Sequence, residues 1–572
     1  MKRIRHAGLL ALATLLAGPL HLAQTPHVAP PAHTSHVGPR EAANVSTRPK
    51  LVVLIVVDQM RGDYVDRFKG QWTGGLKRLL QEGAWFHEAA YPYAKTETCV
   101  GHATISTGAL PATHGIVANA WWDRETHGMV TCTADPRAKT SAGGDPIDSS
   151  WRLRVPTFAD ELKFQGGGKT RAVAFSLKAR SAIMLGGASA DVEIWLRNGS
   201  WVNSSELTTL PFVDQLIDAR PVKEDYGKTW VLALPKDRYF YPEQTPGAVA
   251  PAGWTSSFPH PLRGNTDEAF YEQWSSSPFA DTYLTKLAEN AVDRWGLGNN
   301  RGTDFLAISY SSVDYVGHAF GPRSWEIQDI LVRLDGDLGE LFAHLDARVG
   351  RGNYLVAFSA DHGVAPVPED MQKTGTDAGV LHIPEVQEKI EKALQPFNYS
   401  KPAVAQIVSS DVYFSTGTYD KLKNDSTAMK AVLDAIRAVP GVADVYRAEE
   451  LRDRPATQSP IRRAEANSYF EGRSGDLSIV PRPYWLFSAG PVDQARSYGT
   501  GHGTPYNYDQ HVPIFLMGWG IAHGEHFGAV TPADIAPTLA SLCGVTLATR
   551  DGRVLAEALK NPIASTSPHP AN

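Results

Sequence analysis

The stretch Tyr354-Leu-Val-Ala-Phe-Ser-Ala-Asp-His-Gly363 places an acid and a histidine directly after a largely apolar run. The run Leu51-Val-Val-Leu-Ile-Val-Val57 leads into Asp58 in the same way. Short apolar runs rich in β-branched residues are typical of buried strands. Because a buried carboxylate is costly unless it is paired or bound to a metal, Asp58, Asp361 and His362 predict a polar site where two such strands end.

Outside these two runs, the chain alternates segments with strand and helix character. This alternation predicts an α/β fold with a mostly parallel central sheet and helices on both faces. Ligands of open α/β sheets gather at the carboxyl ends of the strands, so groups distant in sequence can converge there. We expect strands at 51–57, 171–176, 305–310, 354–360 and 511–517, and helices near 76–81, 99–106, 157–164, 281–295, 324–345 and 532–542.

Two long segments interrupt the alternation and are interpreted as insertions that cap the core. Residues 182–262 are rich in Trp, Pro and Asn and contain only short apolar bursts. Residues 371–495 form the second insertion, with helices expected near 386–393 and 428–438. The expected catalytic domain spans residues 49–560, preceded by a flexible leader at 24–48 and followed by a disordered tail at 561–572.

Residues 1–23 have the layout of a secretory signal peptide, with Lys2-Arg3-Ile4-Arg5 before an apolar stretch and small residues near Ala23. The apolar stretch is shorter than the roughly 20 residues that span a membrane, so no stable membrane anchor is expected. These features predict a periplasmic or secreted protein. The formal net charge of −6 argues against nucleic-acid binding, for which a basic surface is typical.

The three cysteines are Cys99, Cys132 and Cys543, an odd number that leaves at least one thiol free. A Cys99–Cys132 bridge is permitted in an oxidising compartment, but nothing in the sequence demands it. Buried free cysteines are the favoured interpretation.

Further polar residues occur in an order suited to a metal and phosphate site. Asp314 and His318 closely follow the expected strand 305–310, and His502 stands between two glycines. Thr98 lies where a loop enters a helix, and helix N-termini favour anions. Lys178 and Arg180 follow another strand and could bind phosphate oxygens. His102 and His511 are expected to be core or supporting histidines rather than ligands.

On these residues the chain resembles the alkaline phosphatase superfamily, and within it the single-threonine, phosphate-irrepressible alkaline phosphatases. The resemblance covers roughly residues 50–180, 300–370 and 497–545. Each motif alone is weak, whereas their joint order and spacing is specific. The motifs are Val57-Asp-Gln-Met-Arg-Gly62, Thr98-Cys-Val-Gly-His102 with Gly115-Ile-Val-Ala-Asn119, Ser176-Leu-Lys-Ala-Arg180, Asp314-Tyr-Val-Gly-His318, and Asp361-His-Gly363 with Gly501-His-Gly503.

The resemblance implies two Zn²⁺ ions and a covalent phosphothreonine intermediate on Thr98. It assigns Asn119, Lys178 and Arg180 to the phosphate of the substrate. Cys99 lacks the Cys-x-Pro-x-Arg setting of the sulfatase-like members, so it is not expected to be the nucleophile. One zinc ion would be held by Asp314, His318 and His502, and the other by Asp58, Thr98, Asp361 and His362.

The expected activity is hydrolysis of small phosphate monoesters at alkaline pH, because the Lys178–Arg180 pair suits a dianionic phosphate. Two alternatives remain open. The first is a nucleotide pyrophosphatase or phosphodiesterase, which shares the metal ligands and the threonine. The second is a zinc-dependent phosphate-binding protein that has lost its catalytic activity. The physiological substrate, the oligomeric state and the role of the insertions do not follow from the sequence.

Overall fold

The computed structural model describes residues 48–139, 146–203, 211–453, 459–492, 494–548 and 550–560. The expected signal peptide and tail, and the expected leader up to residue 47, lie outside these ranges. All described residues belong to one compact unit, 46–572. None of the helices in the described ranges combines the length and the apolar character needed to cross a membrane.

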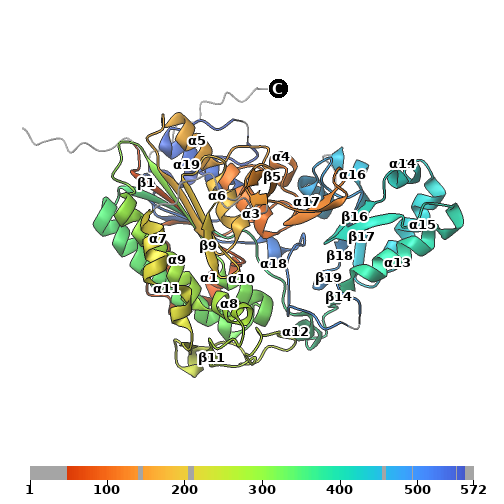
Figure 1. Ribbon diagram of the computed structural model, residues 1–572, viewed down its shortest axis with the longest axis horizontal. Coiled ribbons are helices and arrows are strands. Elements are labelled where there is room, and N and C mark those ends of the chain that lie inside the picture. Colours follow the sequence, from red (N-terminus) through yellow and green to blue (C-terminus); the bar gives the residue numbers. More distant parts are fainter. Residues whose placement is uncertain are drawn as a thin grey trace, which may run out of the picture. The chain divides into compact units, whose positions relative to one another are not determined.

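A nine-stranded sheet forms the centre of this unit, in the order β21-β2-β20-β13-β1-β12-β7-β8-β9 (Figure 1). The five neighbours from β13 to β8 are parallel, while β20 and β9 run antiparallel to the strands beside them. The expected fold class is therefore confirmed. The bounds are β1 Leu51–Val57, β2 Ala84–Phe86, β7 Ala172–Ser176, β8 Val192–Arg197, β9 Ser200–Asn203, β12 Asp304–Tyr310, β13 Tyr354–Ser359, β20 Ile514–Gly518 and β21 Gly524–His526.

The central strands are apolar throughout because both faces of the sheet are covered. Every residue of β1, β12 and β13 is buried. Strands buried on both faces show continuous apolar runs instead of a polar–apolar alternation. In the register, Val57 pairs with Tyr310 and Val56 with Ser359, so the carboxyl ends of the three strands lie together at one edge.

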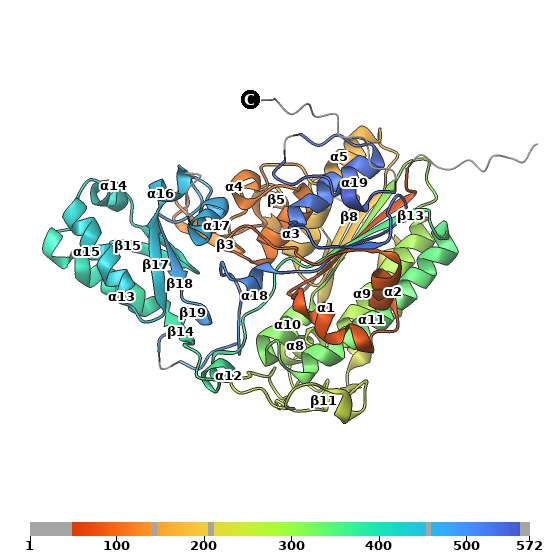
Figure 2. The ribbon, with the colours of Figure 1, turned by 180° about the vertical axis from the view of Figure 1, so that it is seen from behind.

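Helices cover both faces of the sheet (Figures 1 and 2). The helices α2 (Gly75–Glu82), α9 (Pro278–Trp295) and α11 (Trp325–Leu345) pack on one face. The opposite face carries α3 (Thr98–Thr107), α5 (Phe158–Gln165), α6 (Ala179–Gly186) and α19 (Ile535–Cys543). The helices expected in these regions agree within a few residues at either end.

The boundary expected for the first insertion, 182–262, needs correction. Its first residues complete α6, and β8 and β9 extend the central sheet. These strands form a hairpin around Asn198 and Gly199, which both have positive φ, as a two-residue turn of type I′ requires. The stretches 192–197 and 200–203 are therefore the last two strands at one end of the central sheet. The later part of the segment contains α7 (Pro211–Ala219), β10 (Thr229–Trp230) and β11 (His260–Pro261), outside the sheet.

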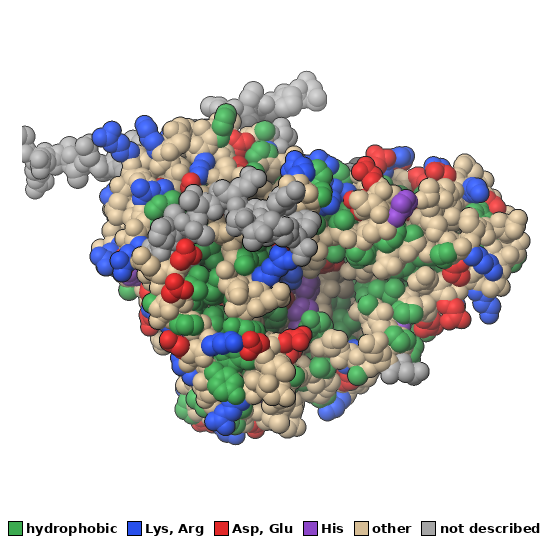
Figure 3. Space-filling view, viewed as in Figure 1, with side chains coloured by type: hydrophobic (Ala, Val, Ile, Leu, Met, Phe, Trp, Pro, Cys, Tyr) green, Lys and Arg blue, Asp and Glu red, His purple; other side chains and the backbone are tan. Residues whose placement is uncertain are grey.

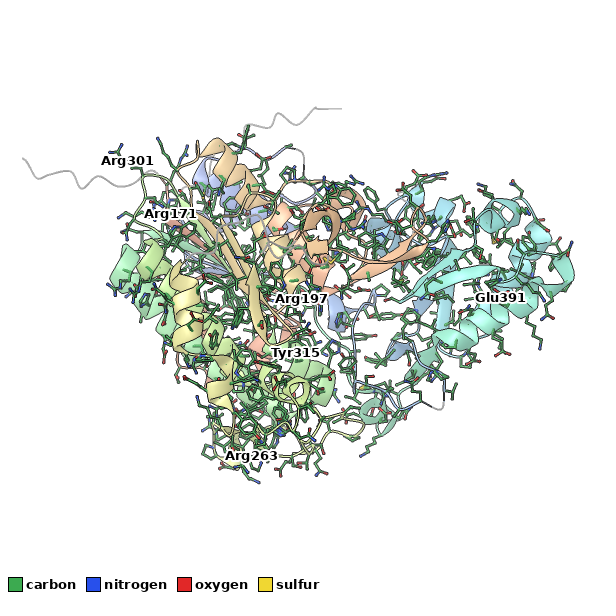
Figure 4. All side chains as sticks on the ribbon, viewed as in Figure 1. Arg171, Arg197, Arg263, Arg301, Tyr315 and Glu391 are labelled. Atoms are coloured by element: carbon green, nitrogen blue, oxygen red, sulfur yellow. A yellow bond between two sulfur atoms is a disulfide. The ribbon has the colours of Figure 1, made fainter. Side chains whose placement is uncertain are left out.

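The second insertion has a sheet and a hydrophobic core of its own. Its antiparallel sheet has the order β15-β16-β18-β17, and α13 (Ile383–Leu394) and α15 (Ser426–Arg437) pack on it. Glu391 on α13, labelled in Figure 4, accepts hydrogen bonds from the backbone of Ala403 and Val404 at β15. The strands are β15 Val404–Val408, β16 Asp411–Phe414, β17 Val442–Arg447 and β18 Leu477–Pro481, with a separate parallel pair of β14 Gly379–His382 and β19 Trp485–Ser488.

Cys99 and Cys132 form a disulfide, so the interpretation of these two as free thiols is wrong; Cys543 is free and buried. The hairpin of β3 (Ala120–Asp123) and β4 (Gly128–Thr131) returns the chain to the start of α3. This return brings the two Cα atoms to 6.6 Å, within the range of a disulfide. Local sequence patterns could not reveal it, because it depends on the path of the hairpin.

Replacing Cys132 with serine is expected to lower the free energy of unfolding by roughly 3–4 kcal/mol, since the bridge closes a loop with a separation of 33 residues. Urea unfolding of wild type and variant would measure the loss. Under reducing conditions the two proteins should unfold alike. Equal midpoints under oxidising conditions would contradict the expectation.

Candidate active site

The carboxyl edge of the parallel strands collects most of the expected site residues. Asp58 directly follows β1, and Asp361 and His362 follow β13. Asp314 and His318 lie on α10 (Ser312–Phe320), which begins just after β12. His502 comes from a loop beyond the second insertion. The structure therefore brings together residues separated by most of the chain.

Two groups of these residues are arranged so that each could hold a metal ion. Asp314, His318 and His502 form one group; Asp58, Asp361 and His362 form the other. Within each group the ligand atoms lie within 4.8 Å of one another. The Thr98 hydroxyl lies 3.4 Å from Nε2 of His362, beside the second group.

The three histidines present the same nitrogen to their groups. Nδ1 of His318, His362 and His502 donates to the backbone carbonyls of Thr500, Gly363 and Thr96, at 2.8, 2.9 and 2.7 Å respectively. A carbonyl can only accept, so Nδ1 carries the proton and Nε2 keeps its lone pair. Metal-binding histidines are oriented in this way. Each histidine is thus preorganised to bind a metal through Nε2.

The buried carboxylates also fit a cation. Oδ1 of Asp58 and Oδ2 of Asp361 are buried and accept no hydrogen bond within the described part of the chain. Burial raises the pKa of Asp58 well above its ordinary value, and the Asp314 and Asp361 carboxylates raise it further. Burial alone would also raise the pKa of Asp314, but Lys178 and His318 outweigh it and hold that pKa well below the usual range. Of the three carboxylates, Asp58 and Asp314 are paired with the single ammonium of Lys178, so negative charge remains that a divalent ion would neutralise.

Gln59 connects the two groups, a role that the sequence did not reveal. Its backbone N–H donates to Oδ1 of Asp361 at 3.0 Å, and its side-chain amide donates to Oδ1 of Asp314 at 2.6 Å. Its φ of 69° lies in the left-handed region, which is uncommon outside glycine. A Cβ at position 317 would lie 1.8 Å from the Gln59 amide oxygen, so Gly317 leaves room for this side chain.

Lys178 is placed differently from its expected position open to the substrate. It is buried, and Nζ contacts Oδ2 of Asp58 at 2.6 Å and Oδ2 of Asp314 at 2.5 Å. Burial alone would lower the pKa of Lys178, but the Asp314 and Asp58 carboxylates raise it above its ordinary value. The ring of Tyr315 on α10 lies 5.0 Å from Nζ, and Figure 4 labels this residue close to the lower end of the sheet.

Arg180, two residues further on, does line the cavity described below. Its Nε is buried and has no hydrogen-bond partner among the described residues. The guanidinium is therefore available to an anion in the cavity, whereas the ammonium of Lys178 is held by the carboxylates.

Thr98 is the first residue of α3, where free backbone N–H groups favour an anion. The start of α3 lies against the residues that follow β13, because a Cβ at Gly101 would come within 2.1 Å of the Asp361 carbonyl oxygen.

Asn119 is fixed near Thr98. Its side-chain oxygen accepts a hydrogen bond from the Cys99 N–H at 2.8 Å, and its own backbone N–H donates to Glu97 at 2.7 Å. Burial raises the pKa of Glu97, the residue before Thr98.

A cavity of about 690 Å³ opens in front of these residues. Thr98, Asn119, Arg180 and His502 line one side, and residues 486–490 of the second insertion line the other. Figure 3 shows histidine side chains in a hollow between the sheet region and the insertion, with hydrophobic side chains along the insertion. The site is therefore enclosed by both parts of the unit.

The second insertion also holds the loop that leads to Thr98. Nζ of Lys95 and Oδ2 of Asp411 form a buried ion pair at 2.5 Å. The hydroxyl of Ser468 accepts from the backbone N–H groups of Ala94 and Lys95, and Ser409 donates to Glu97 at 3.3 Å. Neither Lys95 nor Asp411 stands out in the sequence, because they are far apart and only the fold pairs them.

Replacing Lys95 with alanine is expected to destabilise the protein by about 3–5 kcal/mol, because Asp411 would remain buried without a partner. Urea unfolding measures this change. The double replacement Lys95→Met with Asp411→Leu should cost less than Lys95→Ala, since no charge is left unpaired. A loss below about 1 kcal/mol for Lys95→Ala would indicate an exposed, weak pair.

His102 and His511 stand outside both groups, as expected. Both nitrogens of His102 are engaged, with the Thr98 carbonyl and the Ser309 hydroxyl, each at 2.8 Å. Nε2 of His511 bonds the His87 carbonyl at 2.7 Å. These histidines support the backbone around the site.

Residues 52–505 match the family model described as type I phosphodiesterase / nucleotide pyrophosphatase. The chain belongs to this family. Alkaline phosphatase PhoV of Synechococcus elongatus is 33% identical over 90% of this chain and 93% of its own length. The expected relationship to the alkaline phosphatases is thus confirmed, and with it the expectation of an enzyme.

The crystal structure of alkaline phosphatase PafA shares this family fold with a TM-score of 0.81 and 31% identity, over 90% of this chain and 99% of PafA. A second PafA structure, with a TM-score of 0.81, 30% identity and the same coverage, carries substitutions at a threonine, an asparagine, a lysine and an arginine.

Proposed function

We propose that this protein hydrolyses phosphate monoesters at alkaline pH, with two zinc ions and a covalent phosphothreonine intermediate. The observation that carries the proposal is the pair of histidine–carboxylate groups next to Thr98, with Nε2 of each group histidine turned toward its carboxylates.

The donor atoms suit zinc, which favours imidazole nitrogen and carboxylate oxygen in four-coordinate sites. Asp314, His318 and His502 would hold one ion, and Asp58, Asp361, His362 and the Thr98 hydroxyl the other. Two bound zinc ions would supply Lewis acidity, which lowers the pKa of a bound hydroxyl and stabilises negative charge on the attacking and leaving oxygens.

Thr98 would act as the nucleophile. Its Oγ1 forms a bond to phosphorus while the bond from phosphorus to the ester oxygen breaks, and the hydroxyl proton is finally carried by the departing alcohol. Water then cleaves the phosphothreonine, releases inorganic phosphate and restores the hydroxyl. The N-terminus of α3, the Asn119 amide and the Arg180 guanidinium would bind the phosphate oxygens.

Lys178 would add a positive charge next to the phosphate. Its Nζ reaches one carboxylate of each group, so a phosphate oxygen bound between the groups would lie near it. A monoester dianion benefits from Lys178 and Arg180 together, whereas a diester carries one charge and a second bulky group.

The substituted PafA residues support these roles. The substituted threonine and asparagine of PafA are as far apart in sequence as Thr98 and Asn119 are in this chain. The substituted lysine and arginine of PafA are two residues apart, as Lys178 and Arg180 are. We place the protein in the periplasm or outside the cell on the strength of its N-terminal sequence. A nucleotide pyrophosphatase or phosphodiesterase is the second candidate, because the matching family model is named for those activities.

Phosphate release from an aryl phosphate monoester at alkaline pH tests the proposal, with an aryl diester as the control. We expect turnover dominated by the monoester, lost on chelation and restored by zinc. Dominant diester turnover would support the second candidate. No turnover of either ester by the zinc-loaded protein would favour a binding protein.

A further inference from the structure

We propose that the wall of the cavity formed by the second insertion and Tyr498 is a subsite for the ester group of the substrate, and that it selects phosphate esters of flat aromatic alcohols. The inference rests on the proposed function, because it names the kind of alcohol that the same site releases.

The first observation is the chemistry of that wall. Val380 on β14, Val408 on β15, and Leu486 and Phe487 on β19 line the cavity opposite Thr98 and Arg180. Val408 packs against the main core, and Phe487 packs against the core of the insertion. Leu486 pairs with Val380, whereas Phe487 pairs with the core residue Leu381. Because successive strand residues point to opposite faces, Val380 and Leu486 share the face away from the core of the insertion and offer apolar surface to the cavity. An apolar ester group would remove this surface from water.

The second observation is Tyr498, which lines the cavity with 58% of its surface exposed. A single exposed aromatic residue is ordinary, but this ring lies 5.0 Å from the ring of His318, a residue of the first metal group. A flat group attached to a phosphate at the metal groups would have a ring to stack on at this point. Stacked aromatic pairs are favourable beyond the area that they bury.

The backbone at Tyr498 is held in place. The N–H groups of Gly499 and Thr500 donate to the His318 carbonyl at 2.9 and 3.1 Å, and Arg496 donates to the Gly499 carbonyl at 3.1 Å. Arg496 is also paired with Glu369 at 2.5 Å, so its charge is compensated. This side of the cavity thus offers an aromatic ring on a held backbone together with apolar side chains, which suits a neutral ring better than a polyanionic group.

The test compares 1-naphthyl phosphate with methyl phosphate in the zinc-loaded wild type and in Tyr498→Ala and Leu486→Ala. Leu486 is included because it lines the cavity from β19 and belongs to neither metal group, so its loss does not remove a metal ligand. The quantity to compare is the ratio of kcat/KM for the naphthyl ester to kcat/KM for the methyl ester. We expect this ratio to decrease by about two- to tenfold relative to wild type in each variant. Phe164→Ala is the matched control, since that ring is 84% exposed on α5 and should leave the ratio unchanged.

Two further results separate this proposal from the proposed function. Equal losses on both esters, with reduced zinc content, would mean that the residues only support the metal groups and would overturn the subsite. If wild type turned over neither ester, binding of 1-naphthylphosphonate and methylphosphonate by calorimetry would decide. Weaker binding of the naphthyl compound alone in both variants would retain the subsite while refuting the phosphatase, and unchanged binding would refute both.

Discussion

Replacing Thr98 with alanine should lower kcat for an aryl phosphate monoester by at least about a thousandfold while zinc content and phosphate affinity change little. The variant loses the attacking oxygen but keeps the histidine–carboxylate groups and the backbone N–H groups of α3. Steady-state kinetics measure the first effect. Elemental analysis and calorimetric titration with inorganic phosphate measure the other two.

Thr107→Ala is the matched control for this experiment. It removes a threonine hydroxyl from the last turn of the same helix, where that hydroxyl donates to the Ala103 carbonyl. Thr107→Ala should keep its turnover even where it loses stability. A Thr98→Ala protein that retained wild-type turnover would refute the covalent mechanism, and one that had lost its zinc would show that the hydroxyl is needed mainly as a ligand.

Replacing Lys178 and Arg180 together with alanine should lower kcat/KM for the monoester by about a hundredfold or more, with a much smaller effect on a diester. The dianion loses two cationic partners, whereas the diester has less charge to stabilise. The ratio of the two kcat/KM values is the quantity to measure. Arg180→Ala alone should account for part of the shift, because Arg180 lines the cavity.

Measurement of the bound zinc is the control for a second effect of replacing Lys178. Nζ of Lys178 contacts Asp58 and Asp314, so its removal changes the charge around both groups. The comparison is valid only between preparations with equal zinc content. Equal losses on both esters would contradict the proposed discrimination between monoesters and diesters.

The sequence predicted those parts of the fold that depend on local patterns. The apolar runs at 51–57 and 354–360 became the adjacent central strands β1 and β13, and the residues after them reached one edge of the sheet. The 192–203 hairpin was missed because its two strands are only 6 and 4 residues long. Its Asn198-Gly199 turn was the available indication.

What could not be predicted depends on contacts between distant segments. The disulfide of Cys99 depends on the β3–β4 hairpin, and the Lys95–Asp411 pair depends on how the second insertion docks. Lys178 was expected at the correct edge of the sheet. Its burial between two carboxylates follows from side-chain packing, which neither spacing nor residue type specifies.

The spread of the two metal groups along the chain, from Asp58 to His502, has a consequence for biogenesis. The second group is complete only when β1 and β13 have paired. The first group also requires α10 after β12 and the return of the chain beyond the second insertion, which carries His502. Contacts of such long range form late and slowly. High-affinity metal uptake should therefore follow folding, and metal availability would decide how much of the folded protein matures and how well it resists unfolding.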